Sequence, residues 1–450
     1  DQLEDHSLGV REASGSNPDR SIMAERGPHP TLRIKGTKSH SLSGKKIVLG
    51  VTGSIAAVKT VELARELIRH GADVYGVMSE SATEIIHPYT LHYATGHEVI
   101  TKLMGNIEHV EFLGMEGSAD LFIIAPCTAN TLNKIAGGIS DTTVTAFATT
   151  AFGSGIPIIV APAMHETIYK SPVLIENLDK LRSLGVTVIG PKFEEGLAKI
   201  VSTENIILAV MHVFSPKKLA GLRILITGGP TIEPIDPIRV LTNRSSGRTG
   251  IELAKEAYKQ GAEVTLIHSK ELNFEGIKEI RVGTAREMID ACITELREGR
   301  KKQKEYDMLI SAAAISDFSV APSEVKIPSG GDFYLHLIPT GKLVEEVRNE
   351  FPELVIVGFK AETNVSEEEL IRRAREKMGR YNLAMVVAND VGKGGIGTEE
   401  NEVYIIKEGQ KDVDIKHVKG VKSMIAEEIV EELTNLFLER KAFDRFDIQK

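Results

Sequence analysis

The stretch Ile224–Gly250 reads ILITGGPTIEPIDPIRVLTNRSSGRTG, and the fold can be predicted outward from it. A short apolar run at 224–226 ends at Thr227-Gly228-Gly229, as a buried parallel strand does. After Gly247, apolar residues recur at the spacing of one helix face. The loop between strand and helix occupies the place where open α/β sheets bind their ligands.

Charged and hydroxyl side chains gather at the start of the predicted helix. Arg244 and Arg248 flank Ser245, Ser246 and Gly247. Positive charge, hydroxyls and free backbone N–H groups at a helix N-terminus suit a phosphate, so these residues are candidate substrate contacts. The alternative is a decorated Rossmann turn whose arginines are solvated.

The same strand–turn–helix–strand pattern occurs earlier in the chain. A strand at 47–51 meets Thr52-Gly53-Ser54, and a helix and a second strand at 73–78 follow. The sequence therefore predicts the α/β class, with two Rossmann-like doubly wound parallel-sheet domains at 45–214 and 219–450. Further strands are expected at 121–125, 156–161, 186–189, 308–312, 355–359 and 385–388, and helices at 130–136, 173–184, 285–296, 343–349, 367–378 and 422–439.

The composition excludes several classes of protein. The 450 residues carry a formal net charge of −9, which gives no support to nucleic-acid binding. Two cysteines cannot form a disulfide framework or a cysteine-rich zinc site, so a reducing cytoplasm is expected. No membrane span and no signal peptide are expected. Residues 1–44 are polar and predict a flexible arm, within which Met23 is a candidate true start that leaves 1–22 as an extension.

The first turn is a candidate cofactor site. Gly53, Ser54 and Ile55 lie at a predicted helix start, and Ser79 follows the second strand. Only one glycine lies in the turn, which disfavours a dinucleotide pyrophosphate and favours a monophosphate such as FMN. The alternative is that Ser54 is an ordinary helix cap.

A second candidate segment, PCTANT at 126–131, directly follows a predicted strand. Cys127 and Thr128 would allow a flat ring to approach, and the amide of Asn130 suits a carboxylate or a flavin. His109 is a candidate for proton transfer, because imidazole side chains commonly serve as general acids and bases near neutrality. The alternatives are a helix cap for Asn130 and a structural role for the histidine.

These segments resemble two known enzyme families. The matching residues of the first domain are Gly53-Ser54-Ile55-Ala56-Ala57, His109, the PCTANT segment and Pro162-Ala163-Met164, and they resemble the FMN-dependent cysteine decarboxylases. The loop at 228–250, AAAISDF at 312–318, GFKAET at 358–363 and VAND at 387–390 resemble phosphopantothenate–cysteine ligases. Together they resemble the family of bifunctional coenzyme A biosynthesis proteins, which fuses both activities in this order.

For the first domain, the resemblance implies that 4′-phosphopantothenoylcysteine is decarboxylated with FMN to 4′-phosphopantetheine. His109 matches the catalytic histidine, Asn130 matches the residue that holds the substrate carboxylate, and the candidate cofactor residues match the FMN-phosphate positions. Met164 and His165 fall on the substrate-binding motif, with histidine at a position where the family has asparagine.

The family's substrate flap contains a cysteine that is the expected proton donor, and the corresponding stretch here, 191–199, contains none. The hypothesis is that Lys199, Glu194 or Glu195 replaces it, ahead of Cys127.

For the second domain, the resemblance implies ligation of 4′-phosphopantothenate with cysteine through an acyl-cytidylate formed from CTP. Arg239 and Asn243 match positions that handle this intermediate, and Lys326 matches the first lysine of a lysine-rich run. The later lysines of that run are absent, and Lys342 or Lys360 is expected to supply their charge.

The remaining expected contacts of the second domain concern the metal ion and the base. Asp317 is a candidate ligand of Mg²⁺ and of the substrate, although an aspartate after a strand is otherwise often a cap. Phe359 matches the residue that cradles the base, with Asn389 near it. The absence of the later lysines of the lysine-rich run leaves the choice between CTP and ATP open.

Two other readings remain, a flavin-binding regulatory protein without turnover and an NAD-dependent oxidoreductase. The resemblance also implies a homo-oligomer, with trimers formed by the decarboxylase domain and dimers by the ligase domain.

Overall fold

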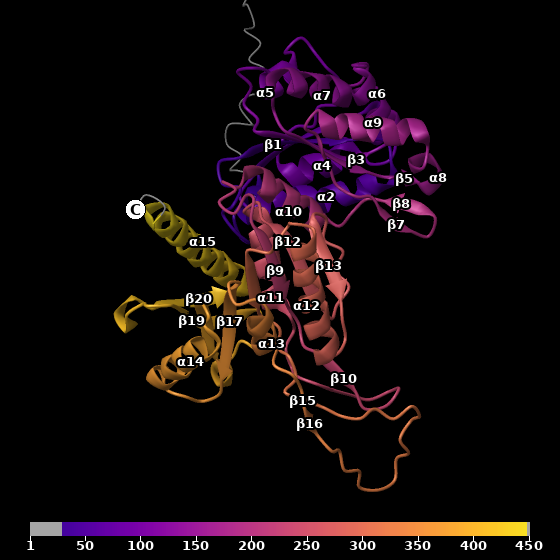
Figure 1. Cartoon of the computed structure of the whole chain (residues 1–450). Helices are drawn as coiled ribbons and strands as arrows, with labels where there is room; N and C mark the ends of the chain where they lie inside the picture. Colours follow the sequence, from indigo (N-terminus) through magenta and orange to yellow (C-terminus); the bar gives the residue numbers. More distant parts are fainter. Residues whose placement is uncertain (1–28, 448–450) are drawn as a thin grey trace, which may run out of the picture. The chain divides into compact units, whose positions relative to one another are not determined.

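The computed structural model describes residues 29–447, and these divide into two compact units that meet between Thr203 and Glu204. Each unit has its own twisted, mostly parallel sheet with helices packed on both faces (Figure 1). The predicted fold class of two Rossmann-like doubly wound domains is confirmed. The predicted start at Met23 and the extension 1–22 lie outside the described residues.

The N-terminal unit is built on a five-stranded sheet with the order β2-β1-β3-β4-β6, and every strand pair in it is parallel. Its strands are β1 (Lys46–Val51), β2 (Asp73–Met78), β3 (Leu121–Cys127), β4 (Ile158–Pro162) and β6 (Thr187–Val188). Apart from Lys46 at the start of β1, the central strands are apolar, because helices cover both of their faces. All five predicted strands of this unit therefore exist.

Helices of the N-terminal unit are mostly short. They are η1 (Pro30–Ile34), η2 (Ile55–Lys59), α2 (Thr60–Arg69), α3 (Glu80–Thr83), α4 (Pro88–Thr95), α5 (Glu108–Leu113), α6 (Ala129–Gly137), α7 (Thr143–Ser154), α8 (Glu166–Tyr169) and α9 (Pro172–Ser183). Helix α7 was not predicted, although Thr142 and Thr145 form a reciprocal capping box at its start.

Residues 29–44 correct the prediction of a flexible arm at 1–44. They include η1 and fold against the first βα unit: the hydroxyl of Thr31 donates to the carbonyl of Tyr93, and Leu42 is fully buried. Lys35 pairs with Asp73 at 2.6 Å. The sequence did not reveal these anchoring side chains, because they are few, lie among glycines and serines, and show no sustained periodicity.

A small antiparallel sheet, β5-β8-β7, follows the end of β4. Its strands are β5 (Met164–His165), β7 (Lys192–Glu194) and β8 (Leu197–Lys199). We call residues 191–199 the flap. The turn at its tip contains Glu195 and Gly196, both with positive φ angles.

The C-terminal unit is built on an eight-stranded sheet with the order β13-β12-β9-β14-β17-β18-β19-β20. The strands are β9 (Arg223–Thr227), β12 (Glu263–His268), β13 (Ile277–Arg281), β14 (Met308–Ser311), β17 (Val355–Glu362), β18 (Met385–Asp390), β19 (Glu400–Lys407) and β20 (Lys416–Val421). The last two pair antiparallel, so one edge of the sheet departs from the predicted parallel pattern.

The helices of this unit are α10 (Thr203–Phe214), α11 (Arg248–Lys259), α12 (Ala285–Lys301), α13 (Leu343–Glu350), α14 (Glu367–Tyr381) and α15 (Lys422–Asp447), with short turns η3 (Val391–Lys393) and η4 (Asp412–Asp414). All five helices predicted for this unit exist, some of them longer than predicted, whereas α10 was not predicted. Helix α11 starts close against β9, because a Cβ on Gly250 would lie 2.7 Å from the Cα of Gly228. No helix in the described part of the chain combines the length and the apolar character that crossing a bilayer requires.

Two hairpins project from the body of the C-terminal unit (Figure 1). One pairs β10 (Ile232–Pro234) with β11 (Val240–Thr242), and the other pairs β15 (Phe318–Ser319) with β16 (Ile338–Pro339). We call residues 232–242 the first arm and residues 318–339 the second arm. The predicted join at 215–218 lies beyond α10, and the compact C-terminal unit already begins at Glu204.

Candidate active sites

The candidate cofactor residues of the N-terminal unit converge at the carboxyl edge of its sheet. The hydroxyl of Thr52 donates to the carbonyl of Pro126 at 2.8 Å and accepts from the backbone N–H of Thr128 at 3.0 Å. These two hydrogen bonds hold the turn after β1 beside the turn after β3. Residues that are far apart in sequence are thereby brought to one edge, as parallel strands require.

The turn after β1 has space only for glycine. A Cβ on Gly53 would lie 2.5 Å from the hydroxyl oxygen of Ser81, which itself lies 3.1 Å from the hydroxyl of Ser79. Ser54 caps η2 by accepting from the N–H of Ala56 at 3.3 Å, and Ile55 is exposed. The result is a small, hydroxyl-lined cradle at the ends of β1 and β2.

Asn130 is not a helix cap. Thr128 caps α6 by accepting from the N–H of Thr131, which leaves the side chain of Asn130 exposed in the first turn. Cys127 is fully buried in β3, and burial raises the pKa of its thiol. Such a thiol is a poor proton donor to an accessible substrate.

His109 carries an unsatisfied buried atom. It lies in the first turn of α5, and its Nδ1 is buried without a hydrogen-bond partner among the described residues. Its ring lies 6.3 Å from that of Phe147. Because buried polar atoms are usually paired, this nitrogen is a candidate ligand contact.

The flap presents an ion-paired cluster. Lys199 lies 2.5 Å from a carboxylate oxygen of Glu195 and 3.3 Å from one of Glu194. The hydrogen bond with Glu195 is the main reason that the pKa of Lys199 is raised, and the one from Lys199 lowers the pKa of Glu194. Met164 pairs with Ala198, so the flap and the Met164–His165 segment form one surface.

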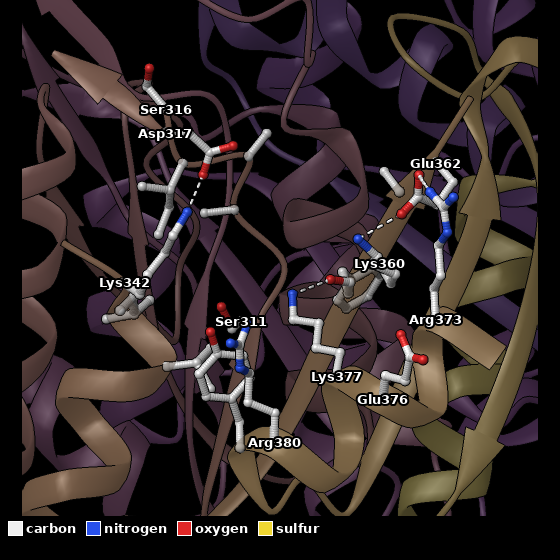
Figure 2. Close-up of a pocket in the computed structure, with 18 of the residues that line it drawn as sticks. Ser311, Ser316, Asp317, Lys342, Lys360, Glu362, Arg373, Glu376, Lys377 and Arg380 are labelled. Atoms are coloured by element: carbon white, nitrogen blue, oxygen red, sulfur yellow. Dashed lines mark hydrogen bonds and ion pairs between the residues drawn. The ribbon is translucent and has the colours of Figure 1, made fainter. Parts of the chain in front are cut away.

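The C-terminal unit contains a cavity of about 890 Å³ between the carboxyl ends of β14 and β17 and the helices α13 and α14 (Figure 2). Six cations and three carboxylates line it, which leaves a surplus of positive charge. They are Lys342, Lys360, Arg372, Arg373, Lys377 and Arg380, with Asp317, Glu362 and Glu376.

Ion pairs occupy several of these cations. Lys342 pairs with Asp317, and Lys360 and Arg373 both pair with Glu362 at 2.7 Å. Lys377 instead donates to the carbonyl of Phe359 at 2.7 Å, with no carboxylate partner among the described residues (Figure 2). Burial lowers its pKa to about 8, and the nearby charges of Lys360 and Lys342 act in the same direction.

The loop between β9 and α11, residues 228–247, lies next to this cavity. The amide of Asn243 donates to the carbonyl of Ala314, a cavity residue, and accepts from the N–H of Ser245. Lys270 donates to the carbonyl of Ser246 at 2.5 Å. Gly247 adopts a φ of +75°, and a Cβ there would lie 2.8 Å from the Cα of Gly229.

Arg248 was predicted to contact a phosphate, but in the structure its guanidinium pairs with Glu399 at 2.6 Å. Asn389, at the end of β18, is buried and lies 3.4 Å from the side-chain oxygen of Asn401.

Several predicted site residues do not line the cavity, namely Asn243, Ser245, Ser246, Gly247 and Asn389 beside it and Arg239 and Lys326 in the two arms. Arg239 lies in the first arm, where it contacts Asp236 and the carbonyl of Ile327, and Lys326 is exposed in the second arm. The described residues contain no cluster of three His, Cys, Asp or Glu side chains that could hold a metal ion. Asp317 is therefore a single carboxylate beside Lys342.

Sequence reasoning missed Lys377, Arg373 and Asp236. The first two lie four residues apart on α14, a spacing that places them on one helix face. The sequence predicted a helix at 367–378 but gave no role to its side chains. No feature of the sequence other than its position among prolines pointed to Asp236.

Both units match known families. Residues 35–215 match the family described as "Flavoprotein", and residues 219–437 match the "DNA/pantothenate metabolism flavoprotein C-terminal domain". The chain is 48% identical over 411 residues to the coenzyme A biosynthesis bifunctional protein CoaBC of Thermococcus kodakarensis, covering 91% of this chain and 99% of that one. The corresponding protein of Methanocaldococcus jannaschii is 41% identical over 91% of this chain and 98% of its own length.

Solved structures resemble single units. The C-terminal domain of a coenzyme A biosynthesis bifunctional protein is 28% identical, with a TM-score of 0.39, over 50% of this chain and 99% of that one. The FMN-dependent cysteine decarboxylase SpaF is 28% identical, with a TM-score of 0.33, over 37% of this chain and 94% of that one.

Proposed function

Since this chain belongs to the family of coenzyme A biosynthesis bifunctional proteins, with a decarboxylase and a ligase activity in one polypeptide, we propose the substrates of each unit. The C-terminal unit joins 4′-phosphopantothenate to cysteine at the expense of CTP. The N-terminal unit then decarboxylates 4′-phosphopantothenoylcysteine to 4′-phosphopantetheine with FMN.

The observation that carries the ligase assignment is the surplus of cations in the cavity. Lys377 lacks a carboxylate partner, and Lys342 and Lys360 need only exchange one carboxylate each for a phosphate. A nucleoside triphosphate carries the matching negative charge. Mg²⁺ commonly binds through one or two carboxylates plus substrate phosphates, and Asp317 offers one such carboxylate.

Activation of the pantothenate carboxylate needs residues that hold the acyl group next to the nucleotide. Asn243 is bound to the loop that lines the cavity, through the carbonyl of Ala314. Ser245, Ser246 and Gly247 follow after Arg244, directly before α11, and the N–H groups of Ser245 and Gly247 donate within the loop and hold its shape. We assign this loop to the phosphorylated substrate, and we assign Phe359, with Asn389 on the neighbouring strand, to the base.

The N-terminal cradle fits a flavin mononucleotide. Gly53 can carry no side chain, and Ser54, Ser79 and Thr128 supply hydroxyls at the ends of adjacent strands. When bound there, FMN supplies hydride transfer to and from the cysteine moiety of the substrate. Ser79 also occupies the end of β2, where NAD-binding sites carry an acidic residue, which disfavours the NAD-dependent oxidoreductase.

His109 and Asn130 supply the polar contacts of the decarboxylase site. The exposed amide of Asn130 is free to bind the carboxylate that is lost, and the unpaired Nδ1 of His109 is available to hold a proton. These two groups support turnover rather than a purely regulatory flavin-binding protein.

The flap supplies the proton that the product needs. Of the three candidates, Lys199 is the donor in this cluster, because its ammonium donates to the carboxylates of Glu194 and Glu195. Its Nζ would deliver that proton once the substrate displaces Glu195. Cys127 is buried and is not proposed.

A coupled assay tests both halves. Purified protein receives 4′-phosphopantothenate, cysteine, Mg²⁺ and CTP, and products are followed by mass, with the absorption spectrum recorded for flavin. Formation of 4′-phosphopantetheine, CO₂ and CMP is expected. Accumulation of 4′-phosphopantothenoylcysteine alone would contradict the decarboxylase proposal, and product formed with ATP but not with CTP would contradict the nucleotide assignment.

Two further features complete the proposal. A homo-oligomer with ligase dimers and decarboxylase trimers, and a location in the cytoplasm, follow from the family rather than from any interface or signal in the described residues. Sedimentation of the full chain would test the oligomer.

A further inference from the structure

Asp236 is a buried carboxylate in an exposed hairpin. It lies in the turn of the first arm and is 3% exposed, whereas its neighbour Ile238 is 65% exposed. A carboxylate that is removed from water needs several hydrogen-bond donors. The residues around Asp236 must therefore supply these donors, although Asp236 lies outside the core of the sheet.

Four donors meet its two oxygens. Oδ1 accepts from the backbone N–H of Ile238 at 2.8 Å and of Arg239 at 2.7 Å. Oδ2 accepts from the guanidinium of Arg239 at 2.6 Å and from the N–H of Ile327 at 3.1 Å. Desolvation raises the pKa of Asp236, but these hydrogen bonds outweigh it and lower the pKa to about 2.

The side chains of Asp236 and Arg239 together bind the backbone N–H and carbonyl groups of one residue in the second arm, Ile327. Asp236 accepts from the N–H of Ile327, while Arg239 donates to the carbonyl of the same residue at 3.0 Å. A further backbone hydrogen bond joins the N–H of Ser323 to the carbonyl of Ile235 at 2.9 Å. The arm that carries Arg239 is thus fastened beside Lys326, the residue before Ile327.

On the basis of the proposed ligase function, we propose that Asp236 is a positioning residue, which fixes Arg239 and the Lys326 segment in one shared arrangement for the acyl intermediate. Asp236 itself does not reach the substrate. It occupies one Nη of Arg239, and the planar guanidinium keeps its remaining N–H groups for a carboxylate or phosphate. Neither cation has another fixed anchor to the body of the unit among the described residues.

Two variants disrupt the hydrogen bonds of Asp236 in different ways. Asp236→Asn weakens the hydrogen bonds with Arg239 and with Ile327, whereas Ile327→Pro removes the N–H that donates to Asp236 and leaves the carboxylate and Arg239 in place. Ile327→Ala is the matched control, because it shortens the side chain and keeps both backbone groups. We expect kcat for ligation to fall about tenfold or more in the first two variants, with the KM for nucleotide little changed, and to stay at the wild-type value in the control.

Hydrogen exchange followed by mass provides a readout that does not depend on activity. In Asp236→Asn the amides of 237–241 and 323–329 should exchange at least tenfold faster, while the cavity segment 355–362 and the melting temperature are unchanged. Decarboxylation of 4′-phosphopantothenoylcysteine by the same variant reports that the N-terminal unit is intact, and unchanged exchange of the cavity segment reports that the C-terminal unit is folded.

The outcomes are distinct. Wild-type ligation rates and wild-type exchange in Asp236→Asn would overturn the proposal, and so would a general loss of stability with unchanged kcat per folded molecule. If the wild-type chain forms no 4′-phosphopantothenoylcysteine, the ligase proposal fails, and the exchange experiment still decides whether Asp236 holds the two arms together.

Discussion

At the scale of single residues, Lys377 distinguishes the cavity from an ordinary charged surface. Most of the surrounding cations already have a carboxylate partner, whereas Lys377 has only the carbonyl of Phe359. A partly buried ammonium without a counter-ion costs free energy in the empty enzyme. A bound phosphate would remove that cost, so nucleotide binding should depend strongly on this side chain.

Replacing this amine tests its role directly. Lys377→Met keeps the length of the side chain and removes the charge, and we expect the KM for the nucleotide to rise about tenfold or more, as loss of a charge-assisted hydrogen bond predicts. The KM for cysteine should change little. Lys301→Met, on the exposed end of α12, is the control. An unchanged nucleotide KM in Lys377→Met would exclude this lysine from the phosphate site.

The pH dependence of nucleotide binding follows from the same residue. The pKa of Lys377 is about 8 in the empty cavity, and a bound phosphate stabilises the charged form and raises it. Binding therefore takes up a proton between the two pKa values, and affinity should fall as the pH rises through about 8. Titration calorimetry between pH 7 and pH 9.5 in two buffers measures this uptake. Lys377→Met should lack it.

The sequence predicted part of each site at this scale. Gly53, Ser79 and Thr128 were placed together because the carboxyl ends of neighbouring parallel strands share one edge, and the structure has them there. Lys377 was missed because a lysine on an amphipathic helix reads as solvated until the depth of the groove is known. The partners of Asp236 were missed because Ile327 lies 91 residues away.

At the scale of elements, the approach of α11 to β9 depends on a pair of glycines. A Cβ on Gly250 would meet the Cα of Gly228 at 2.7 Å and the carbonyl oxygen of Thr227 at 3.2 Å. Both are backbone atoms, so the helix itself must move. This contact explains why the decisive stretch ends in glycine at 250 as well as beginning with glycines at 228–229.

Gly250→Ala should therefore destabilise the C-terminal unit by about 1–3 kcal/mol, as overpacking does, and lower its ligase activity by shifting the loop at 243–247. Gly379→Ala is the matched control: this glycine is exposed within α14, no atom lies near the added Cβ, and the change should stabilise the helix by about 0.5–1 kcal/mol. Urea unfolding of both variants measures the difference. Equal effects would mean that the close approach is relieved without cost.

The sequence predicted the elements with strong periodicity and missed the irregular ones. The βαβ units were found because buried strands and amphipathic helices have distinct patterns. The flap and the two arms have strands of two or three residues, too short for a period to be recognised. Strands β19 and β20 were missed because they form an antiparallel edge, where alternating polar residues weaken the apolar run.

At the scale of the whole molecule, α10 shows where the chain divides. The residues of this helix were not predicted to be helical, and they fell within the predicted first domain, 45–214, because the linker-like residues 215–218 follow them. In the structure its contacts anchor it to the C-terminal unit. The side chain of Asn205 exchanges hydrogen bonds with the backbone of Asn273 and Glu275 at 3.0 and 2.9 Å, and Leu208 is buried in a core shared with β9 and α11.

Two fragments test this division. A fragment of residues 203–450 keeps α10 and should unfold in urea with a single cooperative transition and full ligase activity. A fragment of residues 219–450 loses the stacking of His212 on Tyr258 at 4.5 Å together with the contacts of Asn205 and Leu208. It should be less stable by about 3 kcal/mol or more, because burying one leucine contributes roughly 1.5–3 kcal/mol and the exposed acceptors add to the loss. Equal stability of the two fragments would instead place the functional boundary at the linker, and α10 would then be a separate element between two independent enzymes.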